Sequence, residues 1–189
     1  MTNLQRLLPP DAAAELLLRR KARASLAEWA KLNGFEPAAH HKLLIDRLEA
    51  VTRGEIDRLA IFMPPGSAKS TYASALFPPW YLAQNPAKSV IAASHTAELA
   101  ERWGRRVRNL VSEHAPRLGY AIAADNQSAG RWATSADGEY YAAGVSGSIT
   151  GRRADLVVRN TPTGVGNTHY RASGKAAPWK HPHGRGEYT

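Results

Sequence analysis

The feature that most constrains the fold is a short apolar run that leads into a turn-rich loop and then a helix. Residues 58–63 read Arg-Leu-Ala-Ile-Phe-Met, a pattern typical of a buried strand. A loop at residues 64–69 follows, and residues 70–76 then favour a helix. A strand that turns directly into a helix gathers free backbone N–H groups and the positive end of the helix dipole at one point. This segment therefore predicts a binding site for an anion.

The side chains of the loop suit the phosphate groups of a nucleotide such as ATP. The amides of Gly66, Ser67 and Ala68 are expected to face the phosphates, and Lys69 is expected to reach the β- and γ-phosphates. The Ser70 hydroxyl is expected to help hold Mg²⁺. The predicted nucleotide-binding residues are Pro65, Gly66, Ser67, Ala68, Lys69, Ser70 and Thr71.

The loop departs from the usual phosphate-loop (Walker A) pattern G-x-x-x-x-G-K-[ST] at two positions. Met63 and Ala68 stand where that pattern has glycine. An ordinary strand–turn–helix with an exposed lysine is therefore an alternative interpretation. The context favours phosphate binding, because an apolar strand precedes the loop and a helix follows it.

Strand and helix patterns alternate along the following residues. Residues 89–94 and 156–158 predict strands, and residues 131–135 and 139–143 predict two more around an Asp137-Gly138 turn. Thr96 is expected to cap a helix. The predicted inward stripe of that helix is Leu99, Trp103, Val107, Leu110 and Val111. This order predicts an α/β fold with three layers around a parallel sheet.

The chain divides into three predicted regions. Residues 1–57 show helical periodicity over 11–32 and 41–51 and are expected to form a helical N-terminal extension. Residues 58–158 are expected to form an incomplete α/β domain. Residues 159–189 contain no Leu, Ile, Met or Phe. Such a segment cannot bury enough apolar surface to offset its ordering entropy, so a disordered tail is predicted.

The chain is basic, with a formal charge of +9 and a pI of about 10.1. A positive excess favours a polyanionic partner such as DNA, although a basic but inert surface is the alternative. The predicted helix after Thr96 places an arginine cluster largely on its outer face, formed by Arg102, Arg105, Arg106 and Arg108. The absence of cysteine excludes disulfides and thiolate metal sites. No apolar run is long enough to span a membrane, so we expect a cytoplasmic protein without a membrane partner.

Several blocks of the chain, in the same order, resemble the ATPase part of phage terminase large subunits. They are Met-Pro-Pro-Gly-Ser-Ala-Lys-Ser-Thr-Tyr-Ala-Ser at residues 63–74, the strand and helix at 91–100, and the runs at 132–134 and 140–152. The resemblance covers roughly residues 12–158. It implies a P-loop NTPase (RecA-like) fold, ATP and Mg²⁺ as cofactors, and packaging of viral double-stranded DNA in a bacterial host cell. It also implies a small terminase subunit and a portal as partners, and a homo-oligomer.

The chain departs from the terminase pattern after the strand at residues 156–158. The resemblance implies two acidic residues there, whereas this chain continues Arg159-Asn160-Thr161-Pro162. Asn160 cannot act as a carboxylate base, so hydrolysis of ATP is expected to be weak or absent. Either point substitution, or truncation and a frame change after Val158 in a prophage gene, explains the difference.

Several functional assignments stay open at this stage. Arg152 or Arg153 is a candidate to act on a neighbouring subunit, or both are surface arginines that flank a strand. His40-His41 either contacts the adenine of a nucleotide or simply begins a helix. For the whole chain, the alternatives to a terminase ATPase are a non-catalytic basic DNA-binding protein, an inert prophage remnant, and a small P-loop kinase.

Overall fold

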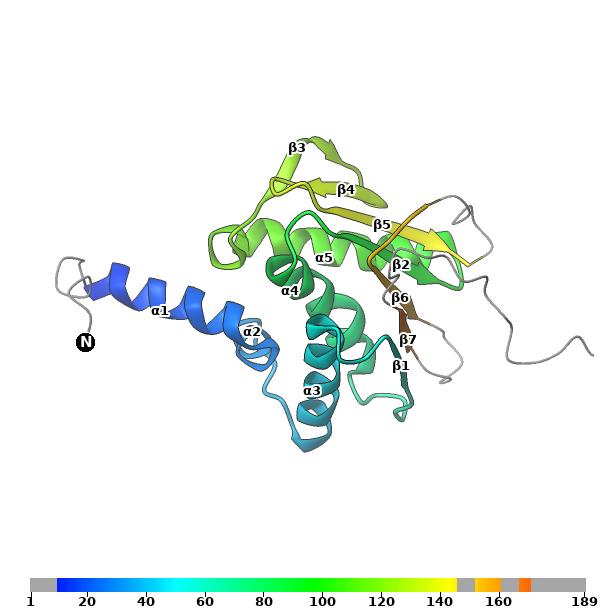
Figure 1. Cartoon of the computed structure of the whole chain (residues 1–189), viewed down its shortest axis with the longest axis horizontal. Helices are drawn as coiled ribbons and strands as arrows, with labels where there is room; N and C mark the ends of the chain where they lie inside the picture. The colour runs from blue at the N-terminus through cyan, green and yellow to red at the C-terminus, as the bar shows by residue number, and fades with distance from the viewer. Residues whose placement is uncertain (1–9, 146–151, 161–166, 171–189) are drawn as a thin grey trace, which may run out of the picture.

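The computed structural model describes residues 10–145, 152–160 and 167–170, which form one sheet with helices packed against it (Figure 1). The helices are α1 Pro10–Ala24, α2 Leu26–Leu32, α3 Ala39–Arg53, α4 Phe77–Gln84 and α5 Ala97–Leu118, with a π-helical segment η2 at Thr71–Leu76. The strands are β1 Arg58–Ile61, β2 Ser89–Ser94, β3 Ile122–Gln127, β4 Arg131–Thr134, β5 Glu139–Gly144, β6 Leu156–Asn160 and β7 Asn167–Tyr170. Within these ranges, no helix has both the length and the apolar character that crossing a membrane requires.

The sheet has seven strands in the order β1-β7-β6-β2-β5-β4-β3. The three central strands β6, β2 and β5 run parallel, and every other neighbouring pair is antiparallel. The prediction of an α/β fold is therefore confirmed, and the parallel sheet is confirmed for its centre only. The predicted pair of strands around the Asp137-Gly138 turn is present as the antiparallel pair β4 and β5.

The described helices cover one face of the sheet, so the described part has two layers rather than the three predicted. Side chains on the helix side of neighbouring strands share one core, as Val90, Tyr140 and Leu156 do. The reason lies in the topology: the connections β1→β2 and β2→β5 move in the same direction across the sheet. Right-handed crossovers that move the same way place their helices on the same face.

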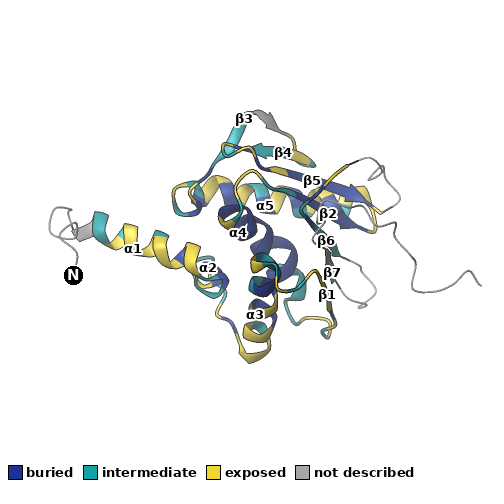
Figure 2. Cartoon of the chain, viewed as in Figure 1, coloured by how far each residue is buried: buried dark blue, intermediate teal, exposed yellow. Residues whose placement is uncertain are grey.

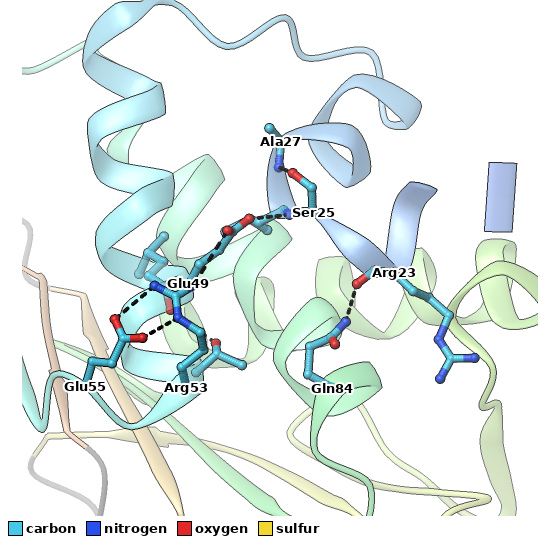
Figure 3. Close-up of polar contacts among 10 residues, drawn as sticks. Arg23, Ser25, Ala27, Glu49, Arg53, Glu55 and Gln84 are labelled. Atoms are coloured by element: carbon cyan, nitrogen blue, oxygen red, sulfur yellow. Dashed lines mark hydrogen bonds and ion pairs between the residues drawn. The ribbon is translucent and has the colours of Figure 1, made fainter. Parts of the chain in front are cut away.

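The N-terminal helices belong to this same core, and α1 projects from it (Figure 2). Trp29 of α2 is completely buried, and its indole N–H donates to the Leu76 carbonyl oxygen at 2.9 Å. At the start of α2, the Ser25 hydroxyl accepts from the Ala27 N–H, and the Glu49 carboxylate of α3 accepts from the Leu26 N–H at 2.8 Å (Figure 3). Both oxygens satisfy N–H groups that a helix start leaves free. The N-terminal helices, expected to form an extension, thus pack against the sheet domain and share its hydrophobic core.

The predicted disordered tail contributes to the sheet. Strand β6 runs to Asn160, and β7 (Asn167–Tyr170) pairs antiparallel with β6 on one side and with β1 on the other. The prediction of disorder is therefore wrong for these residues, because backbone hydrogen bonds to two neighbouring strands form whatever the side chains are. The remainder of the predicted tail, residues 161–166 and 171–189, lies outside the described residues.

We predict that Trp29 is a main anchor of the N-terminal helices. Replacement of Trp29 by alanine should lower the free energy of unfolding by about 3–5 kcal/mol, because it empties a fully buried site and leaves the Leu76 carbonyl without its donor. The midpoint of urea unfolding measures the change. Trp103→Ala is the matched control, since Trp103 is half-exposed on α5, and it should cost less than half as much. Equal losses for the two variants would contradict the assignment.

Candidate phosphate-binding site

The predicted phosphate loop lies where β1 ends and a continuous helical segment, residues 69–84, begins. All residues predicted to bind nucleotide line one cavity of about 390 Å³. The cavity is lined by Met63, Pro64, Pro65, Gly66, Ser67, Ala68, Lys69, Ser70, Thr71 and Asn160. It lies at the carboxyl ends of β1 and β6, the edge where open α/β sheets hold their ligands. The structure therefore brings the whole predicted set together.

The loop has an unusual backbone at two positions. Gly66 has a φ of 79° and Ala68 a φ of 54°, both in the left-handed region. Glycine adopts this region freely, whereas alanine there costs on the order of 1–2 kcal/mol. The Ser67 hydroxyl donates to the Pro64 carbonyl oxygen at 2.6 Å, and the Tyr72 N–H donates to the Ala68 carbonyl oxygen at 3.1 Å. These bonds close the turn and begin the helix.

A widened helix follows the loop. In η2 (Thr71–Leu76) the Phe77 N–H donates to the carbonyl oxygen of Tyr72, five residues earlier. In a regular α-helix, the N–H groups of residues 78 and 79 would donate to carbonyl oxygens one turn earlier. Pro78 and Pro79 have no N–H, so those two hydrogen bonds cannot form. Such π-helical segments occur frequently at functional sites.

His41 of α3 holds the loop from the side. Its Nε2 lies 3.0 Å from the Ser67 carbonyl oxygen, and its Nδ1 accepts from the Ala38 N–H at 3.2 Å. Because Nδ1 is an acceptor, the proton is on Nε2, which therefore donates to Ser67. The imidazole also stacks on the ring of Tyr72 at 4.4 Å between centroids. Burial, and after it the charge of Glu36, raise the pKa of the Tyr72 phenol, so this ring stays neutral.

Asn160 forms the wall of the cavity opposite the loop. It ends β6, and its side-chain Oδ1 lies 3.4 Å from the Ser70 hydroxyl oxygen, a long contact. Its backbone carbonyl accepts from the Ser94 hydroxyl of β2 at 3.3 Å. The residue where the terminase resemblance implies an acid therefore faces the loop but carries no charge.

Arg152 and Arg153 do not join this cavity. Both side chains are exposed and precede the first residue of β6, whereas the cavity lies at the last residue, about 13 Å along an extended strand. The Arg152 guanidinium lies over the Tyr141 ring, 3.9 Å from its centroid. Within one molecule, neither arginine is placed to act on a phosphate in the loop.

We predict that His41 fixes the conformation of the loop. His41→Phe keeps a ring beside Tyr72 but removes both hydrogen bonds, so the amides of residues 66–71 should exchange with solvent faster and stability should fall by about 1 kcal/mol. Hydrogen exchange followed by mass spectrometry measures the loop directly. The control is His40→Phe, because His40 is exposed and its ring packs on that of His41. Unchanged exchange in the His41 variant would overturn the assignment.

Comparison of the chain with family models, with curated proteins and with solved structures finds no match. The resemblance to terminases therefore depends on the residue blocks quoted above.

Proposed function

We propose that this chain binds the phosphate groups of a nucleotide such as ATP in the cavity beside the loop. The observation that carries the proposal is one cavity at the start of a helix that is lined by a lysine and by three residues with hydroxyl groups, Ser67, Ser70 and Thr71. The Ser67 N–H, expected to face the phosphates, donates instead to the Pro64 carbonyl oxygen at 3.3 Å. Lys69 supplies the positive charge, and none of the acidic side chains in the described part of the chain lines the cavity. An anion is the ligand that such a lining favours.

A second, apolar cavity of about 550 Å³ adjoins the first and suits the base of the same nucleotide. It lies between α3 and β1 and shares Met63, Pro64 and Ser67 with the phosphate cavity. Its lining includes His40, Leu43 and Phe62; the latter two are 61% and 70% exposed. Exposed apolar side chains at the mouth of a cavity are typical of a surface that a flat ligand covers. This geometry supports the adenine contact considered for His40.

We further propose that the chain corresponds to the ATPase part of a terminase-type DNA-packaging motor and turns ATP over slowly or not at all. The ordered blocks of residues 63–74, 91–100, 132–134 and 140–152 support the family. The neutral Asn160 at the cavity wall supports the loss of hydrolysis, because loss of a positioned general base typically lowers a rate by about 10²–10⁴.

A non-catalytic basic DNA-binding protein is the second candidate, and the outer face of α5 favours a DNA contact in both cases. Arg102, Arg105 and Arg106 are exposed on this face. Arg105 lies 3.9 Å from the Glu101 carboxylate, and the Arg106 guanidinium lies 5.8 Å from the centre of the Trp103 ring. Such exposed pairings are weak and leave the guanidinium groups available to phosphates.

We predict that Lys69→Ala weakens binding of a fluorescent ATP analogue by more than about tenfold, because a charged hydrogen-bond donor to the phosphates is lost. Fluorescence anisotropy with the full chain measures the affinity. Lys42→Ala is the matched control: Lys42 is an exposed lysine on α3 outside both cavities, and its loss should leave the affinity unchanged. Equal binding by wild type and the Lys69 variant would refute the phosphate site, and release of phosphate at motor rates would refute the loss of hydrolysis.

We predict that DNA binding by the full chain weakens steeply with salt, because phosphate contacts release counterions. The double variant Arg102→Ala/Arg106→Ala should lower the slope of log affinity against log salt by about two. The control Lys31→Ala/Arg53→Ala removes the same charge from exposed positions on α2 and α3 and should leave the slope unchanged. An equal loss in both double variants would show that net charge alone binds the DNA and that α5 has no special part.

A further inference from the structure

The polar groups around Ser70 do not fit a magnesium ion. Among the residues that the structure describes, Lys69 is the one charged side chain that lines the cavity, and no carboxylate lines it. The Ser70 hydroxyl faces the carboxamide of Asn160 at 3.4 Å, and this pair is neutral whichever way the amide is turned. Mg²⁺ is a hard cation that gives up its water reluctantly and is usually bound through one or two carboxylates together with substrate phosphates. At this site the groups beside Ser70 are its own neutral hydroxyl and the neutral carboxamide of Asn160, and neither replaces a carboxylate as a ligand for Mg²⁺.

The residues that follow Asn160 in the sequence add no acid: residues 161–166 contain neither Asp nor Glu. Asp155 lies at the other end of β6, where it accepts from the Lys88 ammonium at 2.8 Å and from the Ser89 N–H at 2.9 Å. These hydrogen bonds of the Asp155 carboxylate stabilise the pairing of β6 with β2. Within the described residues, no group of three His, Asp or Glu side chains could hold a metal ion.

We propose, on the basis of the nucleotide-binding function above, that this site takes the polyphosphate chain as a metal-free anion. Asn160 is the residue that makes this possible. Its Oδ1 faces Ser70, and within the described part of the chain its Nδ2 has no acceptor, so the amide can donate to a phosphate oxygen from the wall opposite Lys69. A carboxylate in the same place would repel the phosphates unless a cation stood between them.

The test compares binding of a fluorescent ATP analogue to the full chain in excess EDTA and in excess Mg²⁺. The wild-type dissociation constants should agree within about threefold, because the ion gains few ligands from the protein. Asn160→Asp should weaken binding in EDTA by more than about tenfold through charge repulsion and loss of the amide donor, and Mg²⁺ should restore most of this loss. The control Asn109→Asp makes the same charge change at an exposed position of α5 and should alter neither constant.

The outcomes separate the inference from the function on which it depends. Wild-type binding that requires Mg²⁺ would overturn the metal-free site and leave the nucleotide site intact. Absence of binding in both buffers would refute the nucleotide site itself. If Asn160→Asp bound equally well in EDTA and in Mg²⁺, the role of Asn160 would be wrong. Circular dichroism establishes that the variant is folded, and if it is not, the wild-type comparison alone decides.

Discussion

The parallel pairing of β2 with β6 is the constraint on which the site depends. At one end of the pair, the Asp155 carboxylate accepts from Lys88 and from the Ser89 N–H. Burial raises the pKa of this carboxyl, but the hydrogen bonds lower it by more, so the pKa lies below its usual range. At the other end, the Ser94 hydroxyl donates to the Asn160 carbonyl. A shift by one residue would turn every side chain of β6 to the opposite face, so the two ends together fix Asn160 opposite Ser70.

The elements that local patterns specify were predicted well. The strand at residues 89–94 matches β2 in both bounds, and the Thr96 hydroxyl accepts from the Leu99 N–H as a helix cap does. The orientation of α5 was predicted less well, because only Val107 and Val111 of the expected stripe are buried. The reason is Gly104: a Cβ at this position would lie 2.5 Å from the Ala129 carbonyl oxygen, between β3 and β4, and 3.4 Å from the Ala142 side chain of β5. The helix therefore packs closely at a residue that hydrophobic periodicity ignores.

The loop could be found from the sequence because its chemistry lies in consecutive residues. The groups that complete it could not. His41 contacts Ser67 across 26 residues and Asn160 contacts Ser70 across 90, and a single sequence carries no sign of such contacts. Asn160 stands out in the sequence only through the resemblance to terminases, which implies an acid at this position. From the sequence, His40-His41 either contacts the adenine or begins a helix; both residues lie in the first turn of α3, and the His41 imidazole also bonds to the loop backbone and packs on Tyr72.

The place of β7 in the sheet has a consequence for the order in which the site assembles. The strand that leads into the loop, β1, pairs with β7, and β7 lies between β1 and β6. The backbones of β1 and β6 are therefore two strand spacings apart, about 10 Å, and the side chains of Ser70 and Asn160 approach each other from beyond the ends of these strands. A ribosome releases β1 more than a hundred residues before β7. The nascent chain therefore contains its phosphate loop before the strand that joins β1 to β6 has been made.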